Sequence, residues 1–165
     1  MARSMIRSLL VTVPLGALPP VGHWSLCSAP DVQAAIARTI APMNFLTRPF
    51  ARSRLTGTNV IYRQLAVSRT AQEITIQYED RPEMRMPADG TPVAWTRNDG
   101  EKMAMRARMD GEDLEQTFKA ADGQRTNRFH VDPATGHLVM GVTVSSGRLP
   151  GPLTYQAEYQ PAPGY

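Results

Sequence analysis

The chain has 165 residues, the size of one domain that can bury about 70% of its unfolded surface without help from a metal or a disulfide. Its single cysteine, Cys27, excludes an intrachain disulfide and leaves no cysteine cluster for a zinc site. The 18 basic and 15 acidic residues come close to balance once Arg3 and Arg7 are set aside, so the charge does not predict a nucleic-acid partner.

Residues 1 to 28 have the pattern of an N-terminal leader. Arg3 and Arg7 precede an apolar run from Leu9 to Leu18, and no acidic residue precedes Asp31. This order is typical of a secretory signal peptide, and a mitochondrial transit peptide is the alternative. The sequence therefore predicts an exported, periplasmic protein that does not span the membrane once the leader is removed.

The end of the leader is less clear than its start. Small residues occur both around Ser25 and around Ala34, so the cleavage site stays open. Leu26, directly before Cys27, is too large for the usual lipoprotein pattern, so a lipid anchor on Cys27 is not favoured.

Residues 29 to 58 are expected to form a short helix followed by an irregular, arginine-rich segment. Ser28 or Asp31 can cap a helix over residues 31 to 40, and Pro42 stops it. The candidate partner-binding arginines Arg48, Arg52 and Arg54 follow in a stretch without acidic residues. They can complement the acidic surface of the later sheet, or they can bind an envelope protein or an anionic membrane surface.

From residue 59 to residue 160 the apolar residues alternate with polar ones, which predicts β-strands. Residues 161 to 165 are read as a tail. The alternating apolar sets are Leu65 and Val67; Ile74, Ile76 and Tyr78; Met84 and Met86; Val93 and Trp95; Met103, Met105, Ala107 and Met109; Leu114 and Phe118; Phe129 and Val131; Leu138, Met140, Val142 and Val144; and Leu153, Tyr155, Ala157 and Tyr159.

Turn residues between these sets predict hairpins whose registers share one apolar face. Asp89-Gly90 pairs Met86 with Val93, and Asn98-Asp99-Gly100 pairs Val93 with Met105 and Trp95 with Met103. The later turns predict the pairs Met105 with Gln116, Phe118 with Asn127, Val131 with Leu138, and Phe129 with Met140. We therefore expect an all-β fold, an antiparallel up-and-down meander of about eight or nine strands that forms a barrel or half-barrel, with the helix as a plug for an open end.

The inward face of this sheet is the candidate ligand-binding surface. Methionine adapts to varied apolar partners, and a barrel of this size either fills its interior or holds one small ligand. Three polar residues, Gln116, Arg125 and Asn127, also point inward, and Arg125 suits a carboxylate or phosphate. The candidate set is Trp95, Met103, Met105, Gln116, Phe118, Arg125, Asn127, Phe129, Met140 and Tyr155.

No motif predicts catalysis, a cofactor or a metal. His23 lies in the leader, His130 faces outward and His137 sits at a turn, without the spacing of a metal site. Polar residues on the outward positions, such as Arg106 and Arg108, exclude an outer-membrane barrel.

The sequence from Asp122 to Phe129, the loop from Asp132 to Gly136, Val142 to Ser146, and Pro152 to Tyr159 resemble an uncharacterised group of exported bacterial proteins with lipocalin-like β-sheets. The similarity covers roughly residues 58 to 160 and implies a curved, lipocalin-like meander or barrel. It assigns no reaction and no catalytic residue.

Three functional hypotheses follow. The first is an exported lipocalin-like domain that binds a small apolar or amphipathic ligand on its methionine-rich inner face. The second is an envelope-associated protein-interaction module with a solid core. The third is a cofactor-free isomerase, cyclase or dehydratase, although no acid and base are visibly paired in the sequence.

Overall fold

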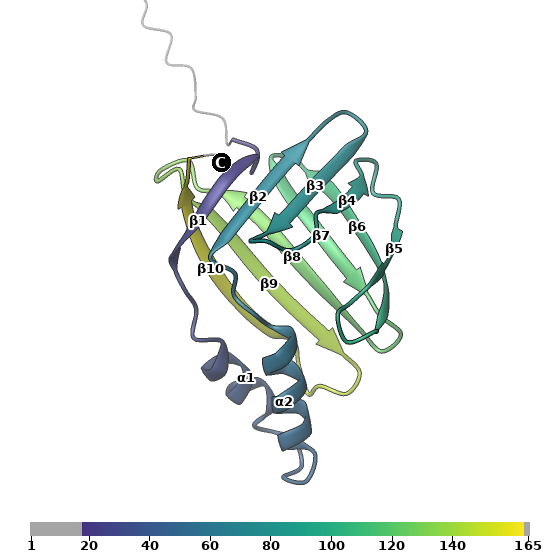
Figure 1. The fold of residues 1–165 in the computed structure, drawn as a ribbon. Coiled ribbons are helices and arrows are strands. Elements are labelled where there is room, and N and C mark those ends of the chain that lie inside the picture. Colours follow the sequence, from purple (N-terminus) through teal and green to yellow (C-terminus); the bar gives the residue numbers. More distant parts are fainter. Residues whose placement is uncertain (1–17, 164–165) are drawn as a thin grey trace, which may run out of the picture.

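The computed structural model describes residues 18–163 and shows an antiparallel sheet rolled into a nearly closed barrel, with two helices at one end (Figure 1). In chain order the elements are β1 (Gly22–Ser28), α1 (Val32–Ile40), α2 (Arg48–Thr58), β2 (Gln64–Arg69), β3 (Glu73–Tyr78), β4 (Met84–Pro87), β5 (Val93–Thr96), β6 (Lys102–Asp110), β7 (Asp113–Lys119), β8 (Gly123–Val131), β9 (Leu138–Ser146) and β10 (Leu153–Pro161). None of the helices among these residues is long and apolar enough to cross a membrane.

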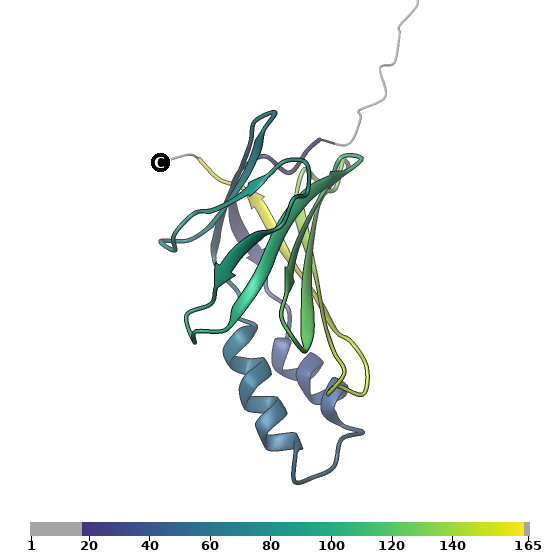
Figure 2. The same cartoon turned by 90° about the vertical axis from the view of Figure 1, so that its right-hand side faces the viewer.

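Neighbouring strands of the sheet are consecutive in the chain, except that β1 also pairs with the last strand, β10, and that β4 and β5 do not pair with each other. Its ten strands run β4-β3-β2-β1-β10-β9-β8-β7-β6-β5, so β1 joins the early strands to the last strand. Figure 2 shows the strands as two facing walls, with α1 and α2 projecting from one end. The all-β antiparallel barrel expected from the sequence is confirmed, with β1 as an additional strand.

The first helix is the one that the sequence predicts. The carboxylate of Asp31 accepts a hydrogen bond of 2.9 Å from the backbone N–H of Ala34, which is the N-cap arrangement. Ile36 and Ile40 are fully buried, so the apolar stripe of α1 packs against the end of the barrel. α1 lies at one end of the barrel, where it contacts α2 and β10, as expected for a helix placed at an end of the sheet.

The sequence analysis expected an irregular segment after the first helix. This expectation is wrong for residues 48–58, which form the helix α2. Pro49 lies in its first turn, where a proline costs no helical hydrogen bond. Leu55 is its one buried residue. The helix was missed because one buried leucine leaves almost no apolar periodicity to detect.

The predicted boundary of the leader at residue 28 is too late for this fold. Residues 22–28 form β1, which pairs with β2 on one side and β10 on the other, and Trp24 is buried in the core. The sheet domain therefore begins at Gly22 rather than at residue 59. Residues 1–17, which hold most of the predicted leader, lie outside the described residues, as do residues 164 and 165 of the tail.

The predicted hairpin registers have three different outcomes. The pairs Trp95 with Met103 and Val131 with Leu138, and the others of their hairpins, are confirmed. The β6–β7 and β7–β8 registers are displaced by two residues, so that Met105 lies opposite Phe118, and Phe118 opposite Arg125. Because side chains alternate with a period of two, this displacement leaves every residue on its predicted face.

The reason for the β6–β7 displacement is the place of glycine in the turn. Asp110 pairs with Asp113, so Gly111, with φ of 63°, takes the first of the two turn positions. A type II′ turn places glycine there, whereas the prediction had it second.

The predicted hairpin between residues 84–87 and 93–96 is wrong. Among the strands that the structure describes, β4 pairs with β3 alone and β5 with β6 alone, which makes these strands the two edges of the sheet. The connection between them crosses to β6, where Asp89 forms an isolated bridge with Arg108. Pro87 and Pro92 flank this connection, and neither has an N–H that could extend a ladder.

Candidate functional site

A chain of polar side chains runs through the apolar interior of the barrel. The Tyr78 hydroxyl donates to Oε1 of Gln116 over 3.1 Å, and Nδ2 of Asn127 lies 3.2 Å from Tyr78 Oη and 3.1 Å from Gln116 Oε1. Gln116 and Asn127 are buried, as the sequence predicts for inward residues. Since buried polar groups need partners, this triangle supplies one to each of the three side chains, and Gln116 Nε2 faces the sulfur of Met84 at 3.5 Å.

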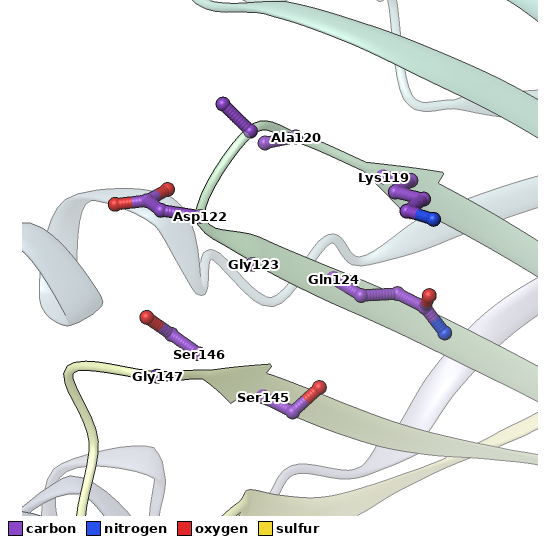
Figure 3. A pocket seen from close by; sticks show the side chains of 9 residues that line it. Lys119, Ala120, Asp122, Gly123, Gln124, Ser145, Ser146 and Gly147 are labelled. Carbon is purple, nitrogen blue, oxygen red and sulfur yellow. The ribbon is translucent and has the colours of Figure 1, made fainter.

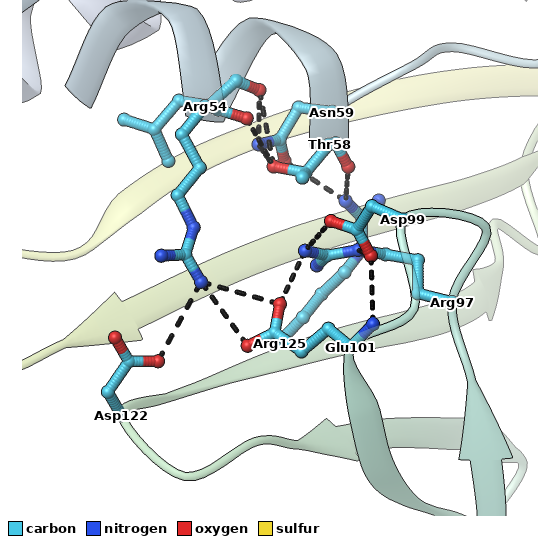
Figure 4. A network of polar contacts seen from close by, with 9 residues as sticks. Arg54, Thr58, Asn59, Arg97, Asp99, Glu101, Asp122 and Arg125 are labelled. Atoms are coloured by element: carbon cyan, nitrogen blue, oxygen red, sulfur yellow. Dashed lines mark hydrogen bonds and ion pairs between the residues drawn. The ribbon is translucent and has the colours of Figure 1, made fainter. Parts of the chain in front are cut away.

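Arg125 continues this chain toward the helices (Figure 4). Its Nε donates to Asn127 Oδ1 over 2.9 Å, and its Nη1 donates to the Thr58 carbonyl over 3.1 Å and to Asn59 Oδ1 over 3.0 Å. Its Nη2 donates to the Tyr155 hydroxyl over 3.3 Å. The guanidinium therefore connects the barrel wall to the C-terminal end of α2.

All of these acceptors are neutral. Thr58 is the last residue of α2, so its carbonyl carries the partial negative charge of a helix C-terminus. Within residues 18–163 no carboxylate forms an ion pair with Arg125, which is half-buried. The end of this chain nearest the helices is thus a cation held by dipoles, and a carboxylate or phosphate would be a stronger partner.

The tyrosines around Arg125 are held in their neutral form. Burial raises the pKa of Tyr78 and of Tyr155, and it raises the pKa of Tyr159 to about 12. The Tyr159 hydroxyl donates to the Tyr62 carbonyl over 3.0 Å. These groups can donate hydrogen bonds near neutral pH but cannot act as bases there.

Ion pairs on the outside hold α2 against the barrel rim (Figure 4). Arg54 lies 3.2 Å from Glu101 and 3.8 Å from Asp122. Arg97 pairs with Glu101 and with Asp99, and its hydrogen bond lowers the pKa of Asp99 to about 2. Arg54 therefore complements an acidic rim, one of the two roles that the sequence left open.

The other two arginines of the predicted partner surface differ from Arg54. Arg48 is half-buried, and its Nη2 donates to the carbonyls of Ala41 and Met43 between the helices. Arg52 is exposed and has no ion pair within the described part of the chain. Of the three arginines, Arg52 is the one whose charge faces solvent alone.

The connection between α1 and α2 and the start of α2 carry three exposed apolar side chains. Phe45 is 73% exposed, Leu46 64% and Phe50 78%. This connection is the part of the helix pair farthest from the barrel in Figure 1. The sequence analysis singled out the arginines of this segment and missed the apolar residues beside them.

The predicted ligand-binding face divides into a tightly packed part and an accessible part. Met105 is 2% exposed, Phe129 0% and Met140 2%, whereas a side chain that lined a water-sized cavity would retain accessible surface. Tyr155 is also buried, and the half-buried members of the set are Trp95, Met103 and Phe118. At its centre the methionine face is packed core in this structure.

Two hollows in the described part of the molecule lie outside the barrel. One, of about 360 Å³, lies between the β7–β8 turn and the end of β9 and is lined mainly by small and polar residues (Figure 3). The other, of about 400 Å³, lies over the outward side chains of β7 to β10. Neither is lined by Arg125, and the polar side chains that converge on it make the interior polar chain the candidate site.

Two members of this chain were not among the predicted site residues. Tyr78 belongs to an alternating set that the sequence had placed on the inward face, so its position could have been found. Asn59 was out of reach of pattern reasoning, because its role depends on how α2 docks: its Nδ2 donates to the Leu55 carbonyl over 2.8 Å and its Oδ1 accepts from Tyr155 over 3.0 Å.

No family model matches this sequence, and no curated protein matches it. Solved structures share its fold. A fatty acid binding protein of Schistosoma mansoni in complex with arachidonic acid has a TM-score of 0.56 and 16% identity over 90% of this chain and 100% of that chain. The wild-type fluorescent protein UnaG has a TM-score of 0.58 and 17% identity over 86% and 96% of the two chains.

A third similar structure is the REP1-NXSQ fatty acid transporter, with a TM-score of 0.55 and 13% identity over 88% of this chain and 97% of that chain. These identities are low, so the likeness defines the fold alone. The fold is that of the lipocalin-like and fatty-acid-binding-protein-like β-barrels, built from ten antiparallel strands and two helices.

Proposed function

We propose that this barrel binds a small amphipathic molecule whose acidic head group pairs with Arg125. The observation that carries the proposal is that Arg125, inside the barrel beneath α2, contacts four neutral oxygen acceptors and no carboxylate within residues 18–163. A carboxylate would form charge-assisted hydrogen bonds to the same guanidinium, which are roughly twice as strong as neutral ones.

Binding of the head group would compete with the helix for Arg125. Nη1 contacts both Thr58 and Asn59 at the end of α2, so a carboxylate placed on Nη1 would displace these contacts. The ligand would then loosen α2 from the barrel while it gains its own ion pair. Arg125 would serve both as the latch of the helix in the free protein and as the ligand's partner in the complex.

The apolar part of the ligand would lie among the inward methionines. Their unbranched thioether side chains can take other rotamers around a guest, whereas branched side chains are stiffer. Since Met105 and Met140 are fully packed in this structure, the ligand tail would have to displace them. The similar barrels that bind or transport fatty acids support this choice of ligand class.

The test compares a carboxylate with an alcohol of the same chain length. Dodecanoate and dodecanol would be titrated into the protein and into the Arg125→Met variant, with Arg128→Met as the matched control. Arg128 lies on the same strand but points outward, where it pairs with Asp110 and Asp113. Losing a hydrogen-bonded ion pair should weaken the binding of dodecanoate by about 10- to 150-fold in Arg125→Met. The affinity of Arg128→Met for dodecanoate should be unchanged.

Dodecanol binding shows whether the variant barrel still folds and accepts a tail. The proposal fails if Arg125→Met weakens both ligands equally, because the arginine would then only hold the fold. It also fails if the unmodified protein binds neither molecule, since the packed interior would then be a permanent core.

The exposed apolar side chains at the tip of the helix pair, which is the α1–α2 connection with the start of α2, favour a second function. We propose that Phe45, Leu46 and Phe50 dock on an anionic membrane surface together with Arg52, which forms no ion pair with another residue of 18–163. Apolar side chains would enter the interface while the guanidinium meets lipid head groups, which is how interfacial amphipathic segments bind.

Sedimentation with vesicles containing phosphatidylserine tests this docking. Fully burying one phenylalanine contributes about 1.5 to 3 kcal/mol, so Phe45→Ser with Phe50→Ser should weaken vesicle binding by at least about tenfold. Val60→Ser removes an exposed apolar residue outside the tip and should have no effect. Equal binding by all three proteins, or binding that is indifferent to salt and to phosphatidylserine, contradicts the proposal.

We also propose that the protein is exported, because the leader pattern of Arg3, Arg7 and Leu9 to Leu18 lies ahead of β1. N-terminal sequencing of the mature protein should find a start before Gly22. An unprocessed chain in the cytoplasm would refute this proposal, whereas a mature start after Gly22 would contradict the place of β1 in the folded protein.

A further inference from the structure

Three residues with different metal-binding atoms meet on the outer face of the barrel. The imidazole Nδ1 of His137 lies 2.6 Å from Glu158 Oε1 and 3.9 Å from Cys27 Sγ. All three donor atoms lie within 4.8 Å of one another. Cys27 is exposed, and His137 and Glu158 are half-buried, so the cluster is open to solvent.

The sheet brings these residues together through three adjacent strands. Cys27 belongs to β1 and Glu158 to β10, and His137 directly precedes β9; these strands lie side by side in Figure 1. Glu158 lies between the other two, with its neighbours Ala157 and Tyr159 buried in the core. Its side chain is therefore held outward by the alternation of the strand.

A local irregularity of β1 aims the thiol at this point. The pairing of β1 with β10 shifts register between Leu26 and Ser28, so Cys27 is the extra residue of a bulge. Its Sγ lies 3.3 Å from the Glu158 carbonyl, to which it donates. Bulges re-aim a side chain away from the ordinary alternation, and here the bulge turns the sulfur toward Glu158.

On the other side a tight turn positions the imidazole. Gly136 has φ of 71°, which favours glycine, and its N–H donates to the Asp132 carbonyl over 2.7 Å. The N–H of His137 donates to Thr135 Oγ1 over 3.2 Å, and its carbonyl accepts from Asp132 over 2.9 Å. The backbone of His137 is thus fixed on both sides before the strand begins.

We propose that Cys27, His137 and Glu158 form a binding site for a divalent transition metal, with Zn²⁺ as the best fit. Thiolate, imidazole and carboxylate are the three ligand types of protein zinc sites, and three protein ligands leave the fourth tetrahedral position to water. The site is distinct from the interior chain at Arg125, because it lies on the opposite face of the sheet.

Both distances to His137 can be compared with those that zinc requires. With ordinary zinc-ligand bonds and a tetrahedral angle, sulfur and nitrogen ligands lie about 3.6 Å apart, and nitrogen and oxygen ligands about 3.4 Å apart. Cys27 Sγ must therefore approach His137 by a few tenths of an ångström from 3.9 Å. Glu158 Oε1 must retreat from its 2.6 Å hydrogen bond, which the metal would replace.

Metal binding would also tie the β1 strand to the rest of the barrel. A ligand that binds the folded chain alone stabilises it, and this site joins β1 to β10 and β9. Zn²⁺ should therefore raise the unfolding temperature of the full-length protein, and a chelator should reverse the rise.

The experiment uses the reduced, metal-free protein and titrates it with Co²⁺ and then Zn²⁺. A thiolate-to-cobalt charge-transfer band should appear with one equivalent of Co²⁺ and disappear as Zn²⁺ displaces it. Cys27→Ser should abolish the band, and His137→Gln and Glu158→Gln should weaken Zn²⁺ binding by about tenfold or more. His130→Gln is the matched control, since His130 also pairs with an outward carboxylate, Asp113, at 2.7 Å but has no thiol beside it.

Two results would overturn the proposal. One is Zn²⁺ binding that is unchanged in Cys27→Ser, which would place the metal elsewhere. The other is the absence of a cobalt band from protein whose thiol reacts stoichiometrically and whose circular dichroism is unchanged, which would leave only a hydrogen-bonded cluster. A disulfide-linked dimer through Cys27 that forms without any metal band counts with the second result.

Discussion

Met105 and Met103 provide a matched pair that separates packed core from ligand-accessible surface. Both lie on β6, two residues apart and on the same face. Met105 is 2% exposed, whereas Met103 is half-buried near the edge strand β5. Replacing each by alanine removes the same atoms from two different environments.

The expected magnitudes follow from burial. Met105→Ala should lower the free energy of unfolding by about 2 to 5 kcal/mol, because the lost transfer energy is joined by the cost of the cavity. Met103→Ala should cost about 1 kcal/mol, because part of its surface is already in water and solvent can fill the space. The difference between the two variants depends on packing alone.

Urea unfolding followed by circular dichroism measures both variants. A loss below about 1 kcal/mol in Met105→Ala would mean that its side chain lines an open space, which would refute the conclusion that the centre of the face is packed core. Equal losses in both variants would refute the assignment of exposure along β6. The cavity in Met105→Ala should also accept a small apolar molecule that the unmodified protein binds more weakly.

Three further predictions concern the ends of the chain, the tyrosines and the first helix. A chain that starts at residue 29 lacks β1 (Gly22–Ser28) and should not give a cooperative unfolding transition, whereas a chain that starts at residue 18 should; cooperative unfolding of the shorter chain would mean that β2 and β10 can close the barrel without it. The folded pKa of Tyr159 lies above the unfolded value of about 10, so its stabilisation is complete below pH 10 and is lost as the pH rises toward about 12. Burial acts on Tyr78 in the same direction. The free energy of unfolding, measured by urea titration at increasing pH, should fall by at most about 1.4 kcal/mol per pH unit for each such tyrosine. A Tyr159→Phe variant with the same alkaline slope would contradict this account. Asp31→Ala removes the N-cap of α1 and should cost about 1 kcal/mol by thermal unfolding, while Asp31→Asn should restore most of it; no loss in Asp31→Ala would mean that α1 contributes little to the transition.

Local patterns in the sequence were sufficient to predict the faces of the strands. Alternation along a strand decides whether a residue points inward or outward, whichever strand lies next to it. The two-residue displacements of the registers on either side of β7 therefore left the predicted faces unchanged. The inward direction of Gln116, Arg125 and Asn127 is confirmed for the same reason. The helix over residues 31 to 40 was also predictable, since its cap and apolar stripe are local.

The errors lie where pairing depends on distant parts of the chain. Residues 22 to 28 resemble the end of a leader, and only the closure of the barrel makes them a strand between β2 and β10. Likewise, the turn signal at Asp89-Gly90 suggested a hairpin, whereas β3 and β6 compete successfully for the two strands. A turn motif shows that a chain can reverse but not which partner offers the better ladder.

The candidate sites show the same division between local and tertiary information. The sequence by itself determined that Arg125 points inward and that Cys27 is the one thiol of the chain, because alternation and composition need no partner. Only the tertiary structure decided that the end of α2 meets Arg125 and that Cys27, His137 and Glu158 converge on one point. Those contacts join residues 21 to 131 positions apart, and their geometry arises from sheet order, a bulge and helix docking, which a local pattern does not encode.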